Sequence, residues 1–224
     1  MSHIGIVQDA TDSAETPKAG HEEWVAELPL AGGPVVRFRH VRPEDEPFIA
    51  EAIRTASRET LLHRFFSPMR SVSPGLLRQM LSIDPAKETC IVGAVTGSGT
   101  VRIICGARYV RLRPGAAEIA LTVHDDFQRR GLGAFLLKLL ARLAQTEGIR
   151  WFEAEVLASN HKMLQLFKKV APRSSGHWTG DVYHIVIDVQ TVAHGEGSAR
   201  AGVRSLTLNP AELTKKMETT DGHG

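Results

Sequence analysis

A strand pattern that runs through a glycine-bearing turn into a long amphipathic helix is the feature that most constrains how this chain folds. The strand, Ala117–Val123, alternates its residues between two faces. The helix after the turn carries leucines at the spacing of a single helix face: Leu132, Leu136, Leu139 and Leu143. Gly148 then ends this helix as a C-terminal cap. The chain is therefore expected to start a helix directly after a strand ends.

Strand and helix signals alternate on both sides of this unit. Alternating patterns and short apolar runs predict strands over 35–41, 90–96, 101–112, 117–123, 151–157 and 181–189. Helices are predicted from residue 42, over 59–66, after 73–74, over the leucine-bearing segment and from residue 160. The order is strand, helices, three-stranded meander, helix, strand, helix, strand. It predicts a mixed sheet covered by helices rather than a pure βαβ repeat.

A single domain over residues 35–190 accounts for all of these elements. The segment 1–34 is mixed and polar and ends in Gly32-Gly33-Pro34, so we expect a flexible N-terminal arm. From 191 to 224 the chain is polar and glycine-rich with little periodicity. There we expect a flexible C-terminal tail with a short helix near 210–217.

Charge, cysteine content and hydropathy narrow the classes of partner. Lysine plus arginine (27) nearly balance aspartate plus glutamate (25), so the composition builds no strong field for nucleic acid. Cys90 and Cys105 lie in apolar runs without metal-ligand spacing, which predicts buried thiols in a reducing compartment. The ten histidines show no metal-ligand spacing either, so we expect no metal. No apolar run approaches the roughly 20 residues of a membrane span and no signal peptide is evident, so we expect a cytoplasmic protein.

The turn Gln128–Ala134 is a candidate phosphate site. The first N–H groups of a helix have no partner within the helix and lie at its positive dipole end, so they bind phosphate oxygens. Gly131 and Gly133 carry no side chains and let a diphosphate approach the backbone. Arg129 and Arg130 add positive charge beside them.

Three phosphate-binding motifs compete for this turn. A P-loop requires a lysine followed by serine or threonine after its last glycine, where this chain has Ala134-Phe135. A dinucleotide-binding turn requires a third glycine, where Leu136 stands, and an early βαβ unit. The coenzyme A turn, Gln/Arg-x-x-Gly-x-Gly/Ala, matches Gln128–Gly133 at each fixed position. The sequence therefore favours the third motif.

With the strand before this turn, the helix after it and the segment that begins at Asn160, residues from about 36 to 190 resemble the GNAT superfamily of N-acetyltransferases. The resemblance implies the GNAT fold, an α/β (α+β) arrangement in which helices flank a mixed, mostly antiparallel central sheet of six or seven strands. The stretch Thr60–Pro68 and the later Ser73-Pro74 resemble, more narrowly, the acetyltransferase domain of bacterial protein lysine acetyltransferases.

The resemblance implies a set of residues that contact acetyl-CoA. In the family the pantetheine arm lies beside the strand that matches Ala117–Val123 and bonds its backbone, here at Leu121 and Val123. The implied coenzyme-binding residues are Leu121, Thr122, Val123, Gln128, Arg129, Arg130, Gly131, Leu132, Gly133, Ala134, Asn160 and Phe167. Asn160 also suits the N-cap of its helix. For Phe167, packing on the coenzyme competes with a place in the core.

Glu118 is the candidate general base. Acidic residues are depleted from strand interiors, so a glutamate at this position suggests a functional role. Period-two alternation places Glu118, Ala120 and Thr122 on one face of the strand, where they would line a cleft. A lysine amine has a reference pKa of about 10.4 and must lose a proton before it attacks a thioester. The protein lysine acetyltransferases use a glutamate on this strand, and the alternative here is a solvated strand charge.

One position departs from the family pattern. Many members carry a tyrosine seven positions after the residue that matches Asn160, where it protonates the leaving thiolate. This chain has Phe167 there, which cannot donate a proton. The leaving thiol of coenzyme A, with a pKa of about 8.5, can depart as a thiolate or take its proton from water.

These features predict an enzyme that moves an acetyl group from acetyl-CoA to an amine, with a protein lysine as the leading acceptor. The alternatives are a small-molecule amine or a protein N-terminus as acceptor, and a non-catalytic module that binds acyl-CoA and regulates a partner. The partners expected are thus an acceptor protein or a small amine, without nucleic acid, membrane or metal.

Overall fold

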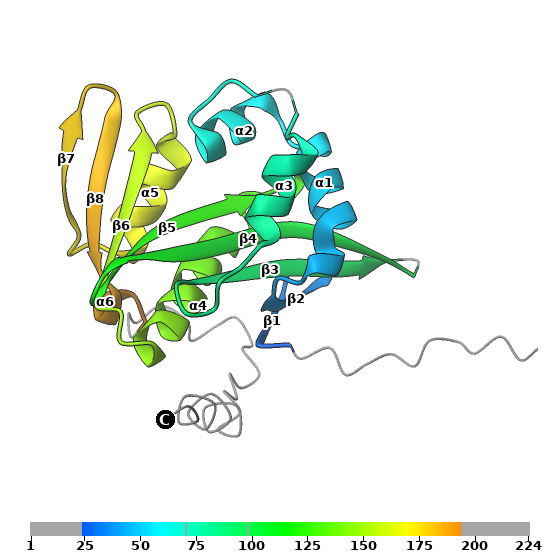
Figure 1. Cartoon of the computed structure of the whole chain (residues 1–224), viewed down its shortest axis with the longest axis horizontal. Coiled ribbons are helices and arrows are strands. Elements are labelled where there is room, and N and C mark those ends of the chain that lie inside the picture. The colour runs from blue at the N-terminus through cyan, green and yellow to red at the C-terminus, as the bar shows by residue number, and fades with distance from the viewer. Residues whose placement is uncertain (1–23, 70, 98, 194–224) are drawn as a thin grey trace, which may run out of the picture.

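The computed structural model describes residues 24–69, 71–97 and 99–193 (Figure 1). Its strands are β1 Ala26–Pro29, β2 Val35–His40, β3 Glu88–Gly97, β4 Thr100–Arg113, β5 Ala116–Val123, β6 Trp151–Leu157, β7 Ser175–Thr179 and β8 Val182–Asp188. Its helices are α1 Glu46–Thr55, α2 Arg58–Phe65, α3 Pro74–Leu81, α4 Leu132–Thr146, α5 His161–Val170 and α6 Val189–Ala193. Two short 3-10 turns, Pro43–Asp45 and Asp125–Phe127, precede α1 and the turn Gln128–Ala134.

The strands form one sheet in the order β1-β2-β3-β4-β5-β6-β8-β7. Neighbouring strands are antiparallel except β5 and β6, which are parallel. The predicted mixed, mostly antiparallel sheet flanked by helices is therefore confirmed. It has eight strands rather than six or seven, because β1 and β7 extend it beyond the six strands that the sequence pattern indicates.

The ends of the domain differ from the sequence-based boundaries. β1 lies inside the segment predicted to be a flexible arm, yet it pairs with β2 and buries Ala26 and Leu28. At the other end β8 stops at Asp188, and α6 follows with Val189 and Val192 fully buried against the core. The rest of the predicted arm (1–23) and tail (194–224), including the helix predicted near 210–217, lies outside the described residues.

Helices cover both faces of the sheet (Figure 1). α1, α2 and α3 lie over β3, β4 and β5 on one face. α4 packs on the other face, where its leucines join the main core. The buried residues of α4 include three of the four predicted leucines, Leu132, Leu136 and Leu139, while Leu143 is partly buried against the same core. Gly148 has a φ of 73°, as the predicted C-terminal cap requires.

Both cysteines behave as the small hydrophobic residues that their apolar surroundings predict. Cys105 is 4% exposed, Cys90 is half-buried, and both are free thiols. Burial raises the pKa of Cys105 to about 12 and that of Cys90 to about 11, so neither is a reactive thiolate near neutral pH. Among the described residues, no helix is both long enough and apolar enough to pass through a bilayer.

Gly93 of β3 packs so closely against the core that no side chain would fit there. A Cβ there would lie 2.5 Å from Cys105 Sγ and 2.8 Å from Phe38 Cε1. We expect Gly93→Ala to lower the free energy of unfolding by about 1–3 kcal/mol, because an overpacked core must shift backbone and side chains. Gly97→Ala on the same strand, where a Cβ meets nothing within 4 Å, is the matched control. Denaturant titration of both variants checks this, and equal midpoints would contradict it.

Candidate active site

β5 and β6 part at Glu118. The two strands pair only over Ala116–Glu118, with Glu118 opposite Glu153 as the last pair. β5 continues to Val123 and stays paired with β4 along this length. The edge of β5 that faces β6 therefore has no strand beside it from residue 119 onward. Such an edge can accept an extended ligand as an added strand.

The register of β4 and β5 decides which backbone groups face this opening. His124 N–H donates to Ile104 O at 2.8 Å, so His124 and Ile104 form a hydrogen-bonded pair of the antiparallel ladder. Hydrogen-bonded and non-hydrogen-bonded pairs alternate along such a ladder. The pairs of Val123 with Cys105 and of Leu121 with Ala107 are consequently non-hydrogen-bonded. The N–H and C=O groups of Leu121 and Val123 thus point away from β4, into the opening.

The predicted phosphate-binding turn follows β5 directly. Gly131 is the N-cap of α4 with a φ of 86°, and Arg129 also has a positive φ, 60°. The backbone N–H groups from Leu132 to Ala134 occupy the first turn of α4, where they have no partner within the helix. Leu132 and Ala134 turn their side chains into the core, so these residues offer a ligand only their backbone. The turn can hold an anion through aligned N–H groups.

The two glycines of this turn serve different purposes. Gly131 supplies the left-handed backbone conformation, and a Cβ on it would meet nothing within 4 Å. A Cβ on Gly133 would lie 3.1 Å from Leu166 Cδ2 of α5. The missing side chain of Gly133 therefore allows α4 and α5 to pack closely. That a diphosphate approaches the backbone at both glycines stays a prediction.

The two arginines of the turn are exposed. The guanidinium of Arg130 lies 5.4 Å from the centroid of the Phe127 ring, and that of Arg102 lies 5.5 Å from the same ring. Arg129 adds its charge next to the helix N-terminus. Positive charge thus accumulates beside the end of α4 that already favours anions.

Gln128, the first residue of the motif, fixes the shape of the turn. Its Nε2 donates to Val123 O at 3.1 Å and to Thr60 Oγ1 at 3.3 Å. Its Oε1 accepts a hydrogen bond from Lys162 Nζ at 2.9 Å. The side chain therefore links β5, α2 and α5. Its role in this structure is to hold the turn, and any ligand contact would come in addition.

Asp125 is a site residue that the sequence patterns did not reveal. Its carboxylate accepts hydrogen bonds from Ser57 N–H, Ser57 Oγ and Thr60 Oγ1, each at 2.8 Å. These bonds attach the first turn of α2 to the loop before the turn Gln128–Ala134. Burial opposes ionisation of Asp125, but the hydrogen bonds from Ser57 and Thr60 outweigh it and lower the pKa. No local pattern could identify a contact between residues 68 positions apart.

Because its folded-state pKa is lowered, Asp125 stabilises the fold above its ordinary pKa of 3.8 and loses that effect as pH falls through the lower folded value. We expect Asp125→Asn to lower the free energy of unfolding by about 1–2 kcal/mol near pH 7, where charge-assisted hydrogen bonds are weakened. The difference from the original protein should shrink below pH 3.8. Denaturant titrations at several pH values measure this, and a difference that grows on acidification would contradict the assignment.

Glu118, Ala120 and Thr122 share one face of β5, as the alternation predicts. Ile119 and Leu121 are buried on the other face. Ala120 and Thr122 line a cavity beneath α1, α2 and α3. Glu118, the next residue on the same face of β5, is exposed. Within the described part of the chain, the buried Thr122 Oγ1 has no hydrogen-bond partner.

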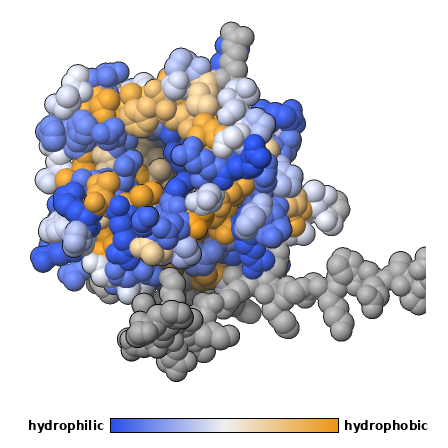
Figure 2. Space-filling view, viewed as in Figure 1, coloured by the Kyte–Doolittle hydropathy of each residue, from blue (hydrophilic) through white to orange (hydrophobic). Residues whose placement is uncertain are grey.

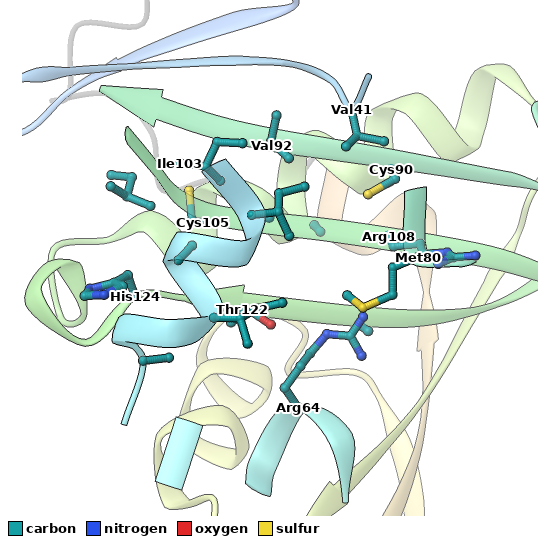
Figure 3. A pocket seen from close by; sticks show the side chains of 18 of the residues that line it. Val41, Arg64, Met80, Cys90, Val92, Ile103, Cys105, Arg108, Thr122 and His124 are labelled. Atoms are coloured by element: carbon teal, nitrogen blue, oxygen red, sulfur yellow. The ribbon is translucent and has the colours of Figure 1, made fainter. Parts of the chain in front are cut away.

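The cavity has an empty volume of about 900 Å³ including its open mouth. Most of its lining is aliphatic, and Figure 3 shows the side chains that project into it. Arg64 of α2 and Arg108 of β4 line it near Met80, and burial lowers the pKa of Arg64. Arg108 forms an ion pair with the buried Glu88. In the view of Figure 2, hydrophobic side chains reach the surface near α2, among otherwise polar residues.

The two remaining predicted residues, Asn160 and Phe167, have different roles in the structure. Asn160 is the N-cap of α5, and its Oδ1 accepts a hydrogen bond from Met163 N–H at 3.1 Å. Phe167 is 2% exposed and belongs to the main core, which is the alternative that the sequence left open for it. In this structure Phe167 presents no surface to the opening, so we assign it no coenzyme contact.

Known proteins resemble this chain in sequence and in fold. Residues 54–171 match the model of the acetyltransferase (GNAT) family. A Pseudomonas aeruginosa protein named as an acetyltransferase is 31% identical over 161 residues, which cover 71% of this chain and 86% of that protein. Acetyltransferase Pat of Mycolicibacterium smegmatis is 35% identical over 133 residues, or 58% of this chain but only 38% of Pat.

A solved structure of the GNAT domain of S. lividans PAT superposes with a TM-score of 0.64 at 27% identity. The match covers 73% of this chain and 96% of that domain. The parted strands β5 and β6 and the glycine turn before α4 lie within residues 54–171, the part of the chain, more than half of it, that matches the family model. The chain belongs to the acetyltransferase (GNAT) family and is an acetyl-CoA-dependent N-acetyltransferase.

Proposed function

We propose that this enzyme transfers the acetyl group of acetyl-CoA to the side-chain amine of a protein lysine, with Glu118 as general base. The observation that carries the proposal is the place of Glu118, at the point where β5 and β6 part and beside the cavity under α2. The resemblance of Thr60–Pro68 to bacterial protein lysine acetyltransferases and the 35% identity to Pat support a protein acceptor.

The coenzyme would lie along the open edge of β5. The N–H groups from Arg129 to Ala134 would hold the diphosphate, and the backbone groups of Leu121 and Val123 would bond the pantetheine arm. Val123 O already accepts a hydrogen bond from Gln128, which leaves its N–H and both groups of Leu121 for the arm. This path runs from the N-terminus of α4 back along β5 and brings the thioester close to Ala120 and Glu118.

The reaction then needs one base. Glu118 takes a proton from the lysine ammonium, directly or through water, and the neutral amine attacks the thioester carbonyl carbon. The new C–N bond forms, the C–S bond breaks, and the sulfur leaves as thiolate. Phe167 stands where many relatives carry a tyrosine, so the thiolate takes its proton from water. The exposed position of Glu118 lets the proton pass to solvent.

The test is release of free thiol from acetyl-CoA with three kinds of acceptor: a mixture of bacterial proteins, polyamines, and no acceptor. We expect release with proteins only, and mass spectrometry of those proteins should locate acetyl groups on lysine side chains. Release with polyamines alone would make the enzyme a small-amine acetyltransferase. Tight binding of acetyl-CoA without any release would support a regulatory module instead.

A further inference from the structure

We propose that the cavity under α1, α2 and α3 is an acyl pocket, and that it admits apolar acyl groups longer than acetyl. This inference rests on the proposed path of the coenzyme along β5, but not on the identity of the acceptor. The cavity begins at β5, is aliphatic at its far end, carries two arginines at the other end, and reaches as far as β3.

The cavity begins where the thioester would lie. Ala120 and Thr122 of β5 form its near edge, and both are small residues on the face that also carries Glu118. The next strand offers no obstruction, because Gly106 of β4 pairs with Thr122 and has no side chain. The hydrocarbon chain of an acyl group attached at the thioester can therefore extend over Gly106 into the space below α1.

The far end of the cavity is aliphatic. Beyond Gly106 the floor continues to Val92 of β3 and Ile103 of β4, which form a separate apolar cluster with Val41 and Ile49. The roof is one face of α1, which contributes Ile49, Ala52 and Ile53, together with Ala56 directly after the helix. Figure 3 shows Val92, Ile103 and Val41 together on the side away from Arg64. This end offers a hydrocarbon chain apolar neighbours.

The end of the cavity that carries two arginines is where we expect the acceptor amine to approach. Arg64 and Arg108 line the cavity next to Met80, and Arg108 is paired with Ala120, two residues along β5 from Glu118. Two guanidinium groups favour the neutral form of a nearby amine. The amine would therefore approach at the side of Glu118, while the acyl chain points the opposite way, toward Ile103.

The length of the cavity exceeds what an acetyl group needs. It crosses from β5 over β4 to β3, two strand spacings or about 10 Å. Residues of all three strands line it, from Ala120 and Thr122 of β5 through Gly106 of β4 to Val92 of β3. The methyl of an acetyl group reaches only the edge of this space at Ala120 and Thr122.

The test compares acetyl-, butyryl-, hexanoyl- and octanoyl-CoA as donors to one fixed acceptor. Each methylene that enters an apolar pocket should lower the donor KM by about fourfold. Allowing for incomplete burial, we expect the KM for hexanoyl-CoA to be at least tenfold below that for acetyl-CoA. The Kd of each acyl-CoA, measured by calorimetry without acceptor, should follow the same order. A series in which acetyl-CoA is the best or an equal ligand would overturn the proposal.

A substitution in α1, which forms the roof of the cavity, tests where the acyl chain binds. Ala52→Leu projects a larger side chain into the cavity, and Ala50→Leu on the same helix, outside the lining, is the matched control. We expect Ala52→Leu to reduce the preference for hexanoyl-CoA over acetyl-CoA by tenfold or more, and Ala50→Leu to preserve it. If Ala52→Leu instead raises the KM of the acceptor equally with every donor, the cavity holds the acceptor stem and the proposal is wrong.

Two readouts keep this inference separate from the proposed function. If no donor supports transfer to a protein, the protein-lysine proposal fails. The Kd series still decides the acyl pocket, because it requires neither acceptor nor base. If transfer to protein lysines occurs but the Kd values are independent of chain length, only the acyl pocket fails.

Discussion

Replacing Glu118 by glutamine is expected to lower kcat by about 10²-fold or more while the Kd for acetyl-CoA stays within about twofold. Glutamine has nearly the same shape but cannot accept the proton that the ammonium must lose, and loss of a general base has this magnitude. Coenzyme affinity should persist because the proposed coenzyme contacts come from backbone groups of β5 and α4. Stopped assays of thiol release measure kcat, and calorimetry measures the Kd.

The control for this variant is Glu155→Gln. Glu155 lies on β6, is exposed, has its Oε1 3.3 Å from His184 Nδ1, and does not line the cavity. The two variants remove the same charge, so a general effect of net charge would appear in both. The rate of the Glu118 variant should also rise with pH more steeply than that of the original enzyme, because hydroxide and the free amine replace the base. Unchanged turnover in Glu118→Gln would remove Glu118 from the mechanism.

The centre of this fold was predictable because its signals are local. The leucine spacing of α4, the glycines that bound it and the alternation of β5 each arise from residues within one element. Alternation alone also placed Glu118, Ala120 and Thr122 on one face, and the structure confirms that division. The roles of these residues in the reaction remain proposals.

The parts that the sequence did not reveal depend on partners far along the chain. β1 alternates buried and exposed residues over only four positions, and β7 is exposed along its whole length, so neither gives a long alternating hydrophobic run. Asp125 owes its place to Ser57 and Thr60, which no spacing rule connects to it. Gly133 fits the coenzyme motif in sequence, yet the space beside it is limited by Leu166 from another helix.

The packing of Gly133 also decides how the phosphate site is best tested. Any side chain at Gly133 would press on Leu166, so a loss of coenzyme binding there would mix steric and electrostatic causes. Gly131 avoids this difficulty, because a Cβ on it meets nothing within 4 Å. Its φ of 86° lies in the left-handed region, which asparagine and aspartate tolerate better than other side chains. Both residues also suit the N-cap position that Gly131 occupies.

Gly131→Asp is therefore expected to leave the protein folded and to weaken acetyl-CoA binding by about 10²-fold. The new carboxylate would stand among the N–H groups that are proposed to hold the diphosphate, and repulsion between like charges there amounts to roughly 2–3 kcal/mol. Gly131→Asn has the same shape without the charge, so it should weaken binding at least tenfold less. Calorimetric titration of both variants at low and high salt isolates the charge, since screening should narrow the gap between them. Equal affinities for the two variants would place the diphosphate elsewhere, and with it the thioester that Glu118 is proposed to serve.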